Sequence, residues 1–174
     1  MRIYPNCQFV TRTIEIGGLT KSELIQIMQQ QSISRNEYAK KLLSDDKFTT
    51  SDTKYSLQIV ELTVEDLGFS DGATLHQIFK RASELGLELC PLELGLHLRL
   101  EYLDQLEGYL GNPSNQNQAP SGSITVASEI ICEDGGFPKG FYLRKITGVL
   151  WLRGYNADHL HVWNPYDHFI FCQT

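Results

Sequence analysis

Residues 85–105 constrain the fold most, because the hydrophobic period of the chain changes within them. Before Gly86, apolar residues follow the spacing of one helix face, and a glycine at this point is typical of a helix end. After Gly86, apolar and polar residues alternate over 87–90 and again over 96–102, with a proline–glycine corner between the two runs. Alternation places successive side chains on opposite faces of a strand. We therefore predict that a helix ends here and that two half-buried strands follow.

Four segments carry the signature of a helix start, which is a Ser or Thr followed three residues later by an acid or a Gln. They begin at Thr20, Ser34, Thr63 and Thr74. Each is flanked by the pair of apolar residues that forms a hydrophobic staple. We predict a helix from each of these four positions, and the last of them should end near Gly86.

The remaining periodic segments favour strands, because they are short and rich in β-branched and aromatic residues. They are residues 9–16, 55–62, 124–132, 141–146, 149–155, 160–163 and 168–172. The fold class that follows is α+β, with short N-terminal helices packed on one face of a largely antiparallel sheet that the C-terminal half mainly forms. The alternative is a compact α/β arrangement with one parallel pair of strands.

The chain has 174 residues, which favours a single domain over residues 1–174. Residues 111–123 have no apolar periodicity and are rich in Gly, Asn, Pro and Ser, so we expect a long flexible loop there. No apolar run is long enough to span a bilayer, and the N-terminus lacks the apolar core of a signal peptide. We therefore expect a cytoplasmic protein without membrane contact.

Several site chemistries are disfavoured by the sequence. The formal net charge of −6 is unfavourable for broad contact with a phosphate backbone. Residues 17–22 have glycines, a lysine and a serine, but not the Walker spacing that wraps backbone amides around phosphates. Neither Gly-x-Ser-x-Gly nor Cys-x-x-Cys occurs. We expect the four cysteines to be buried and reduced: Cys7, Cys90, Cys132 and Cys172.

The C-terminal histidines are weak candidates for metal ligands. If residues 164–167 form a hairpin turn, His159, His161 and His168 share one strand face with Cys172, and His161 and His168 are diagonal neighbours. Such a group of imidazoles and a thiol could hold a transition metal. We favour the alternative, in which these are polar residues on a solvated face, and we predict no metal and no cofactor.

Arg99 is the charged residue that most needs a partner, because leucines flank it and burying an unpaired guanidinium is costly. Glu93 or Asp104 is the natural carboxylate partner. Together with Glu93 and Gln105, Arg99 could bind an anionic or amide-bearing ligand, which makes these three the candidate catalytic residues. We favour the structural alternative, in which the same residues form an ion-pair lock between two short elements.

The C-terminal tail combines rings and cations. Arg144, Lys145 and Arg153 lie near Trp151, Tyr155 and Trp163 in the sequence. Such a combination resembles the platforms on which single-stranded nucleic acids stack. One face of the sheet must form core, however, so some of these rings should be buried. Contact with nucleic acid is therefore a minor alternative.

Several stretches of the chain resemble a family of small uncharacterised bacterial proteins. These stretches lie within residues 72–105, with Leu-Gly-Leu-Glu-Leu-Cys-Pro and Leu-Arg-Leu, and in the tail segments Leu-Trp-Leu-Arg-Gly-Tyr and Val-Trp-Asn-Pro. The resemblance covers most of the chain from about Leu19. Some members are labelled helicase, but the resemblance implies no defined activity and no catalytic residues. The present sequence has no Walker loop, no Asp-Glu-x-His-type box and no room for two RecA-like folds.

The sequence leaves two main classes of function open. The first, which we favour, is a non-enzymatic module that binds a protein or a small molecule, and self-association is compatible with it. The second is a small hydrolase or transferase with a polar site around Glu93, Arg99 and Gln105. The direction of the Arg99 side chain separates the two, because a site requires it in a pocket and a lock requires it to be paired.

Overall fold

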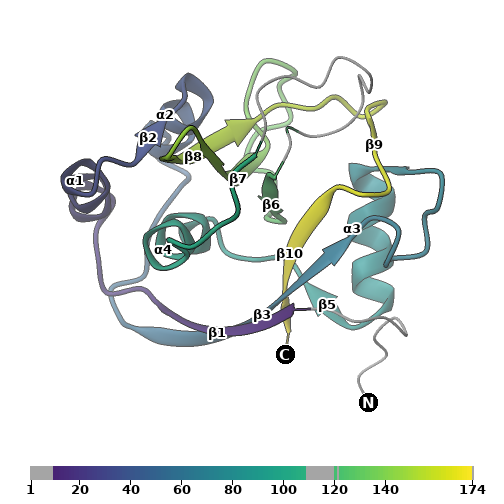
Figure 1. Cartoon of the computed structure of the whole chain (residues 1–174), viewed down its shortest axis with the longest axis horizontal. Coiled ribbons are helices and arrows are strands. Elements are labelled where there is room, and N and C mark those ends of the chain that lie inside the picture. Colours follow the sequence, from purple (N-terminus) through teal and green to yellow (C-terminus); the bar gives the residue numbers. More distant parts are fainter. Residues whose placement is uncertain (1–9, 109–119, 121, 174) are drawn as a thin grey trace.

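The computed structural model describes residues 10–108, 120 and 122–173, and within them the chain is an α+β structure (Figure 1). This confirms the predicted fold class. The helices are α1 (Lys21–Gln30), α2 (Glu37–Ser44), α3 (Leu75–Glu84) and α4 (Glu93–Glu101). The strands are β1 (Val10–Ile16), β2 (Ser34–Arg35), β3 (Tyr55–Thr63), β4 (Ala73–Thr74), β5 (Leu87–Glu88), β6 (Ile124–Val126), β7 (Gly140–Ile146), β8 (Val149–Tyr155), β9 (Val162–Trp163) and β10 (His168–Gln173).

The main sheet has the strand order β1-β3-β10-β6-β7-β8-β2, and β5 also pairs with β10. Two of its pairs, β10 with β6 and β2 with β8, are parallel, and the others are antiparallel. Strands β1, β2 and β3 come from the first half of the chain and β5 spans its midpoint, so both halves build the sheet. The expectation that the C-terminal half mainly forms it was wrong in this respect.

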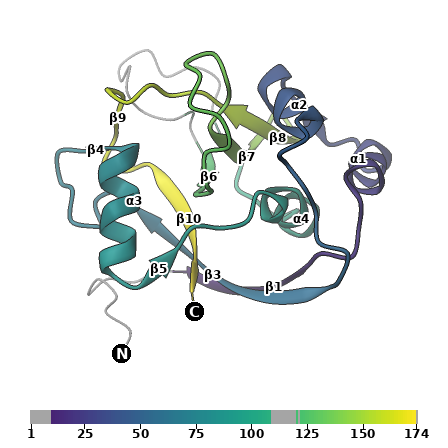
Figure 2. The ribbon, with the colours of Figure 1, turned by 180° about the vertical axis from the view of Figure 1, so that it is seen from behind.

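The alternation of side chains along the central strands sorts them into two cores. Ile59 and Ile170 join a cluster with residues of α1, α2 and α4, whereas Val60, Phe169 and Phe171 join a cluster with residues of α3. Successive strand residues face opposite sides, so helices cover both faces of the sheet and not one. Helices α1 and α3 lie at opposite ends of the molecule (Figure 1 and Figure 2).

Two of the four predicted helix starts are confirmed. Thr20 caps α1 by accepting from the amide of Glu23 at 3.1 Å. Thr74 caps α3 in a complete capping box with Gln77. Gly86 follows α3 with a φ of 81°, in the left-handed region that a helix end of this kind requires.

The two other predicted helix starts are not confirmed, and the first of them is displaced by pairing with a distant strand. Residues 34 and 35 pair with β8 as strand β2, so the chain stays extended and Asn36 becomes the cap of α2. Thr63 and Asp66 do exchange the two capping hydrogen bonds, at 2.9 and 3.0 Å. Only a turn follows them, and it ends at Gly68, which has a φ of 101°.

The predicted strand over residues 96–102 is instead helix α4. This helix lies against β1, β7 and β8 and is buried on nearly all sides. A helix in such a position has no polar face, so its leucines carry no helical period that the sequence could reveal. Gly95 lets the helix approach the sheet, because a Cβ there would lie 3.1 Å from the Phe141 side chain.

The predicted hairpin over residues 160–172 was also wrong. The turn forms, with the amide of Asp167 donating to the carbonyl of Asn164 at 3.0 Å. The strands on either side then diverge, because β9 pairs with β4 and β10 pairs with β3. The predicted strand over residues 124–132 shortens to β6.

Other expectations concern the loop, the membrane and the cysteines. Most of the predicted loop at 111–123 lies outside the described residues. Within the described chain, no helix has the length and apolar character needed to cross a membrane. Cys90 and Cys172 are buried and free, and Cys132 is free and half-buried. Cys7 lies outside the described residues.

Candidate functional site

The side chain of Arg99 points into the protein interior and is completely buried. Its terminal nitrogens donate to Gln105 Oε1 at 2.6 Å, to the Trp151 carbonyl at 3.2 Å, and to the carbonyl of Tyr102. Among the described residues it forms no ion pair, so the predicted carboxylate partners, Glu93 and Asp104, were wrong. Burial lowers the pKa of Arg99 to about 10, which leaves it charged at neutral pH.

Gln105 completes this buried polar cluster. Its amide nitrogen donates to the carbonyls of Gly122 and Leu143, at 3.0 and 2.9 Å. The side chain therefore joins the end of α4 to β7 and to the segment before β6. Arg99 and Gln105 together donate to four backbone carbonyls, those of Tyr102, Gly122, Leu143 and Trp151, which is a structural role.

Glu93 lies at the other end of α4 and takes no part in this cluster. Its carboxylate accepts from the Tyr55 hydroxyl at 2.8 Å and from the Ser51 amide at 3.0 Å. Six residues of helix separate it from Arg99, a distance of about 9 Å along the axis. The structure thus joins two of the three candidate catalytic residues and separates the third.

The histidine candidates are dispersed because the hairpin does not form. His161 packs edge-to-face on Trp163, with ring centroids 5.2 Å apart. His168 pairs with Glu61 on β3, with Nδ1 and Oε2 at 2.9 Å. His159 is exposed. Across the described parts of the chain, no group of three or more His, Cys, Asp or Glu side chains is arranged to hold a metal ion.

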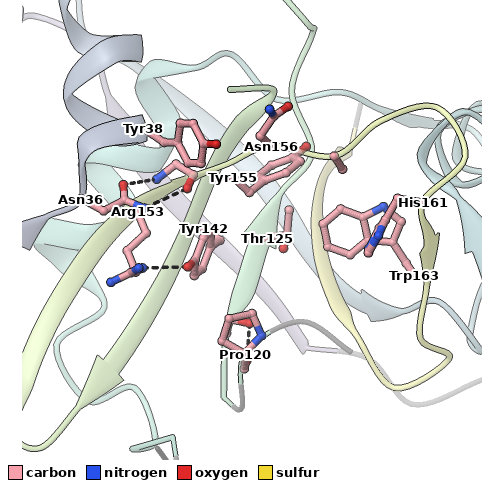
Figure 3. A pocket seen from close by; sticks show the side chains of 13 residues that line it. Asn36, Tyr38, Pro120, Thr125, Tyr142, Arg153, Tyr155, Asn156, His161 and Trp163 are labelled. Carbon is pink, nitrogen blue, oxygen red and sulfur yellow. Dashed lines mark hydrogen bonds between the residues drawn. The ribbon is translucent and has the colours of Figure 1, made fainter. Parts of the chain in front are cut away.

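A pocket of about 330 Å³, which we call the aromatic pocket, lies beside β6, β7 and β8 (Figure 3). It is on the sheet face whose side chains join the α3 cluster. Tyr142 and Tyr155 line it from the sheet, and Trp163 and His161 face them from β9 and the loop before it (Figure 3). The other lining residues are Asn36, Tyr38, Pro120, Ser123, Thr125, Arg153, Gly154, Asn156 and Ala157. Rings from β7, β8, β9 and the loop before β9 therefore surround a space of ligand size.

Asn36 fixes one wall of the aromatic pocket. Its side chain donates to the Gly154 carbonyl at 3.0 Å, accepts from the Gly154 amide at 2.8 Å, and accepts from the Ala39 amide at 2.9 Å. One amide group thus extends the β8 ladder and caps α2 at the same time. A Cβ on Gly154 would lie 2.6 Å from the Tyr38 carbonyl carbon, so only glycine permits this approach.

Arg153 lies at the edge of the pocket between two rings. Its Nε donates to the Tyr142 hydroxyl at 2.7 Å, and its guanidinium carbon lies 4.9 Å from the centroid of the Trp151 ring. These contacts hold the planar group in one orientation. Among the described residues Arg153 forms no ion pair.

Trp163 forms the opposite wall and is 4% exposed. The pairing of β9 with β4 fixes its backbone, and Gly72 allows that contact because a Cβ there would lie 2.3 Å from the Trp163 carbonyl oxygen. Tyr155 and Phe169 pack edge-to-face on its ring, with centroids at 5.4 and 4.9 Å. The indole is therefore rigidly placed.

Polar atoms without partners concentrate at this pocket. Five buried side-chain nitrogen or oxygen atoms of the described residues have no hydrogen-bond partner. Three belong to lining residues, namely the Tyr155 hydroxyl, Asn156 Oδ1 and Trp163 Nε1. A buried polar atom without a partner costs about 1–3 kcal/mol. All three have almost no accessible surface in the free protein, so a ligand reaches them only after the lining side chains move.

A second pocket of about 270 Å³ lies beyond Pro120 and Ser123, which line both pockets. It contains the Glu61–His168 pair and the buried carboxylate of Asp167. The hydrogen bond to Glu61 raises the pKa of His168, against a smaller lowering effect of burial. The partners of these groups lie within the protein, so this pocket offers fewer open contacts than the aromatic pocket.

Sequence analysis anticipated part of the aromatic pocket. The ring-and-cation pattern of the tail included Arg153, Tyr155 and Trp163, which do line it. The pattern did not include Asn36 and Tyr142, which also line the pocket. Half of all the aromatic residues lie in residues 137–174, and this concentration is the sequence signal that could have pointed to Tyr142. Comparisons of the chain with protein-family models, curated proteins and solved structures give no match.

Proposed function

We propose that this chain is a binding module that holds a small planar heteroaromatic ring of the nucleobase kind in the aromatic pocket. The observation that carries the proposal is the set of rings that line the pocket, namely Tyr142, Tyr155, His161 and Trp163. Trp163 Nε1 can only donate, Asn156 Oδ1 can only accept, and the Tyr155 hydroxyl can do either. These atoms are buried in the free protein, so a ligand with a donor and an acceptor on its edge would pair with them only after the lining side chains move.

The lining supports a planar ligand in particular. Tyrosine, tryptophan and histidine rings dominate it, and flat faces bind flat faces with offset or edge contacts. The volume of about 330 Å³ is at the low end of ligand pockets, so it suits one ring system. An aliphatic ligand would leave the polar atoms unpaired.

The titratable groups of the pocket favour binding over proton transfer. Burial raises the pKa of Tyr155 far above its usual value, so its hydroxyl keeps its proton at physiological pH. The described lining residues contain no Asp, Glu or Cys. The alternative hydrolase or transferase site would need Glu93 and Arg99 in one cleft, whereas they lie at opposite ends of α4.

The test uses the indole N–H resonance of Trp163. The sequence has two tryptophans, so a Trp163→Phe variant assigns the signal. Titration of the labelled protein with adenosine, guanosine, cytidine and uridine should shift this resonance saturably for at least one of them. The amide resonances of α1, which packs in the other core cluster, are the internal reference, because the Trp151 ring lies against Arg153 at the pocket edge. No shift with any of the four at millimolar concentration overturns the proposal.

A further inference from the structure

Arg153 lies at the edge of the aromatic pocket, and among the described residues its charge has no carboxylate partner. Its Nε contact with the Tyr142 hydroxyl leaves both terminal nitrogens of the guanidinium without an acceptor among the described residues. No acidic side chain is among the described lining residues. An arginine held flat presents two parallel N–H groups, which match a phosphate or a carboxylate.

The guanidinium is also pre-organised. It lies 4.9 Å from the Trp151 ring centroid and 5.8 Å from that of Tyr142. Most of the entropy that a free arginine side chain would lose on binding an anion is therefore already lost. Arg153 and Tyr142 contact each other and both line the pocket, so a ligand ring in the pocket and a group at Arg153 can belong to one molecule.

We infer that the ligand of this pocket is a nucleotide unit, with its base among the rings and its phosphate on the terminal nitrogens of Arg153. This inference rests on the proposed function and adds the anionic group to it. The same chemistry is available from a free mononucleotide and from single-stranded nucleic acid. Beside Arg153 on the same face, the Trp151 ring offers a surface for a neighbouring base in a strand.

The test compares the affinities of wild-type protein for adenosine and AMP, measured by the Trp163 indole shift. We expect AMP to bind at least about tenfold more tightly, as a bidentate arginine contact allows. The gain should fall below about twofold in Arg153→Gln. It should persist in Arg81→Gln, whose arginine lies on α3 and pairs with Glu84. Equal affinities of wild type for adenosine and AMP overturn the inference and leave the proposed function standing.

Failure of the proposed function gives a different result. In that case neither adenosine nor AMP shifts the Trp163 resonance. The wild-type comparison needs no variant, so a fold defect in Arg153→Gln cannot obscure it. A second variant, Arg153→Lys, keeps the positive charge but loses the two parallel N–H groups of the guanidinium. It should retain only part of the affinity gain of AMP over adenosine.

A six-residue adenine oligonucleotide distinguishes the two sources of the ligand. If the natural ligand is a strand, the oligonucleotide binds at least tenfold more tightly than AMP, and Trp151→Ala removes that increment. If it is a free nucleotide, the oligonucleotide binds no more tightly than AMP. Both results support the inference, and binding of neither AMP nor the oligonucleotide above the level of adenosine overturns it. For one phosphate contact, log K for the oligonucleotide should fall with log[salt] with a slope of about −0.7.

Discussion

Two buried polar regions lie on opposite faces of the β6–β8 part of the sheet, and they differ in how their polar atoms are satisfied. In the Arg99–Gln105 cluster, side-chain nitrogens reach the carbonyls of residues 102, 122, 143 and 151. Only Arg99 Nε lacks a partner. In the aromatic pocket, three buried polar atoms have none.

The difference separates a structural role from a binding role. A buried charge with a nearly complete set of hydrogen-bond partners stabilises the elements that surround it. When it is removed, those partners stay buried without hydrogen bonds, which costs free energy of folding. Unpaired polar atoms around a pocket cost stability in the free protein, and a ligand can recover that cost. From the sequence, Arg99 was a candidate for both roles, and its environment assigns it to the first.

Substitution of Arg99 should have the largest effect on stability. In Arg99→Met, Gln105 Oε1 and the carbonyls of Tyr102 and Trp151 lose their donor in the interior. We expect the free energy of unfolding to fall by about 3 kcal/mol or more, as measured by urea denaturation. Arg81→Met, at a side chain that is 43% exposed, should change it by less than about 1 kcal/mol. Equal losses in the two variants would contradict the structural role.

Gly154→Ala should affect both stability and binding. The new Cβ would lie 2.6 Å from the Tyr38 carbonyl carbon and 2.7 Å from the Ala39 nitrogen, so the start of α2 must move. Overpacking of this kind costs about 1–3 kcal/mol. The matched control is Gly135→Ala, where a Cβ would meet nothing within 4 Å. Loss of adenosine binding in Gly154→Ala, with binding unchanged in Gly135→Ala, would place the ligand at this wall.

The parts of the fold that sequence analysis found are those that local chemistry determines. The caps at Thr20 and Thr74 depend on residues within one helical turn, so the sequence displays them directly. Helix α4 was not predicted, because a helix that is buried on nearly all sides has no amphipathic period in its sequence. The cap at Asn36 was not predicted for another reason. The helix start moves to Asn36 because residues 34 and 35 pair with β8, and Asn36 bonds Gly154, which is 118 residues away along the chain.

The candidate sites show the same division. The proximity of Arg99 and Gln105 was predictable because six residues separate them, and the structure joins them at 2.6 Å. The aromatic pocket brings Asn36, Tyr142 and Trp163 together from three distant segments, and no local pattern encodes that assembly. The tail composition indicated rings and cations, but only the strand register shows which of them share a face.

Tyr155→Phe should have the opposite effect on stability to substitution of Arg99. The Tyr155 hydroxyl is buried without a partner, so its removal eliminates a desolvation cost and leaves the ring packing on Trp163 in place. We expect the free energy of unfolding to stay constant or to rise by up to about 1 kcal/mol. Affinity for adenosine should fall by about five- to tenfold if this hydroxyl bonds the ligand. A destabilised variant would show that the hydroxyl has a partner in the free protein.

The Glu61–His168 pair gives the smallest expected effect, because it is satisfied but partly exposed. The His168 side chain is 46% exposed, so the pair should contribute only a few tenths of a kcal/mol. The hydrogen bond to Glu61 raises the pKa of His168 above 6.5 in the folded protein. The contribution is therefore complete below about pH 6.5 and is lost as the pH rises through the folded pKa. Urea denaturation of wild type and His168→Gln between pH 5.5 and 9 should show their stabilities converging as the pH rises, and Glu61→Gln should reproduce that trend. A stability difference that grows with pH would mean that burial, and not Glu61, controls this histidine.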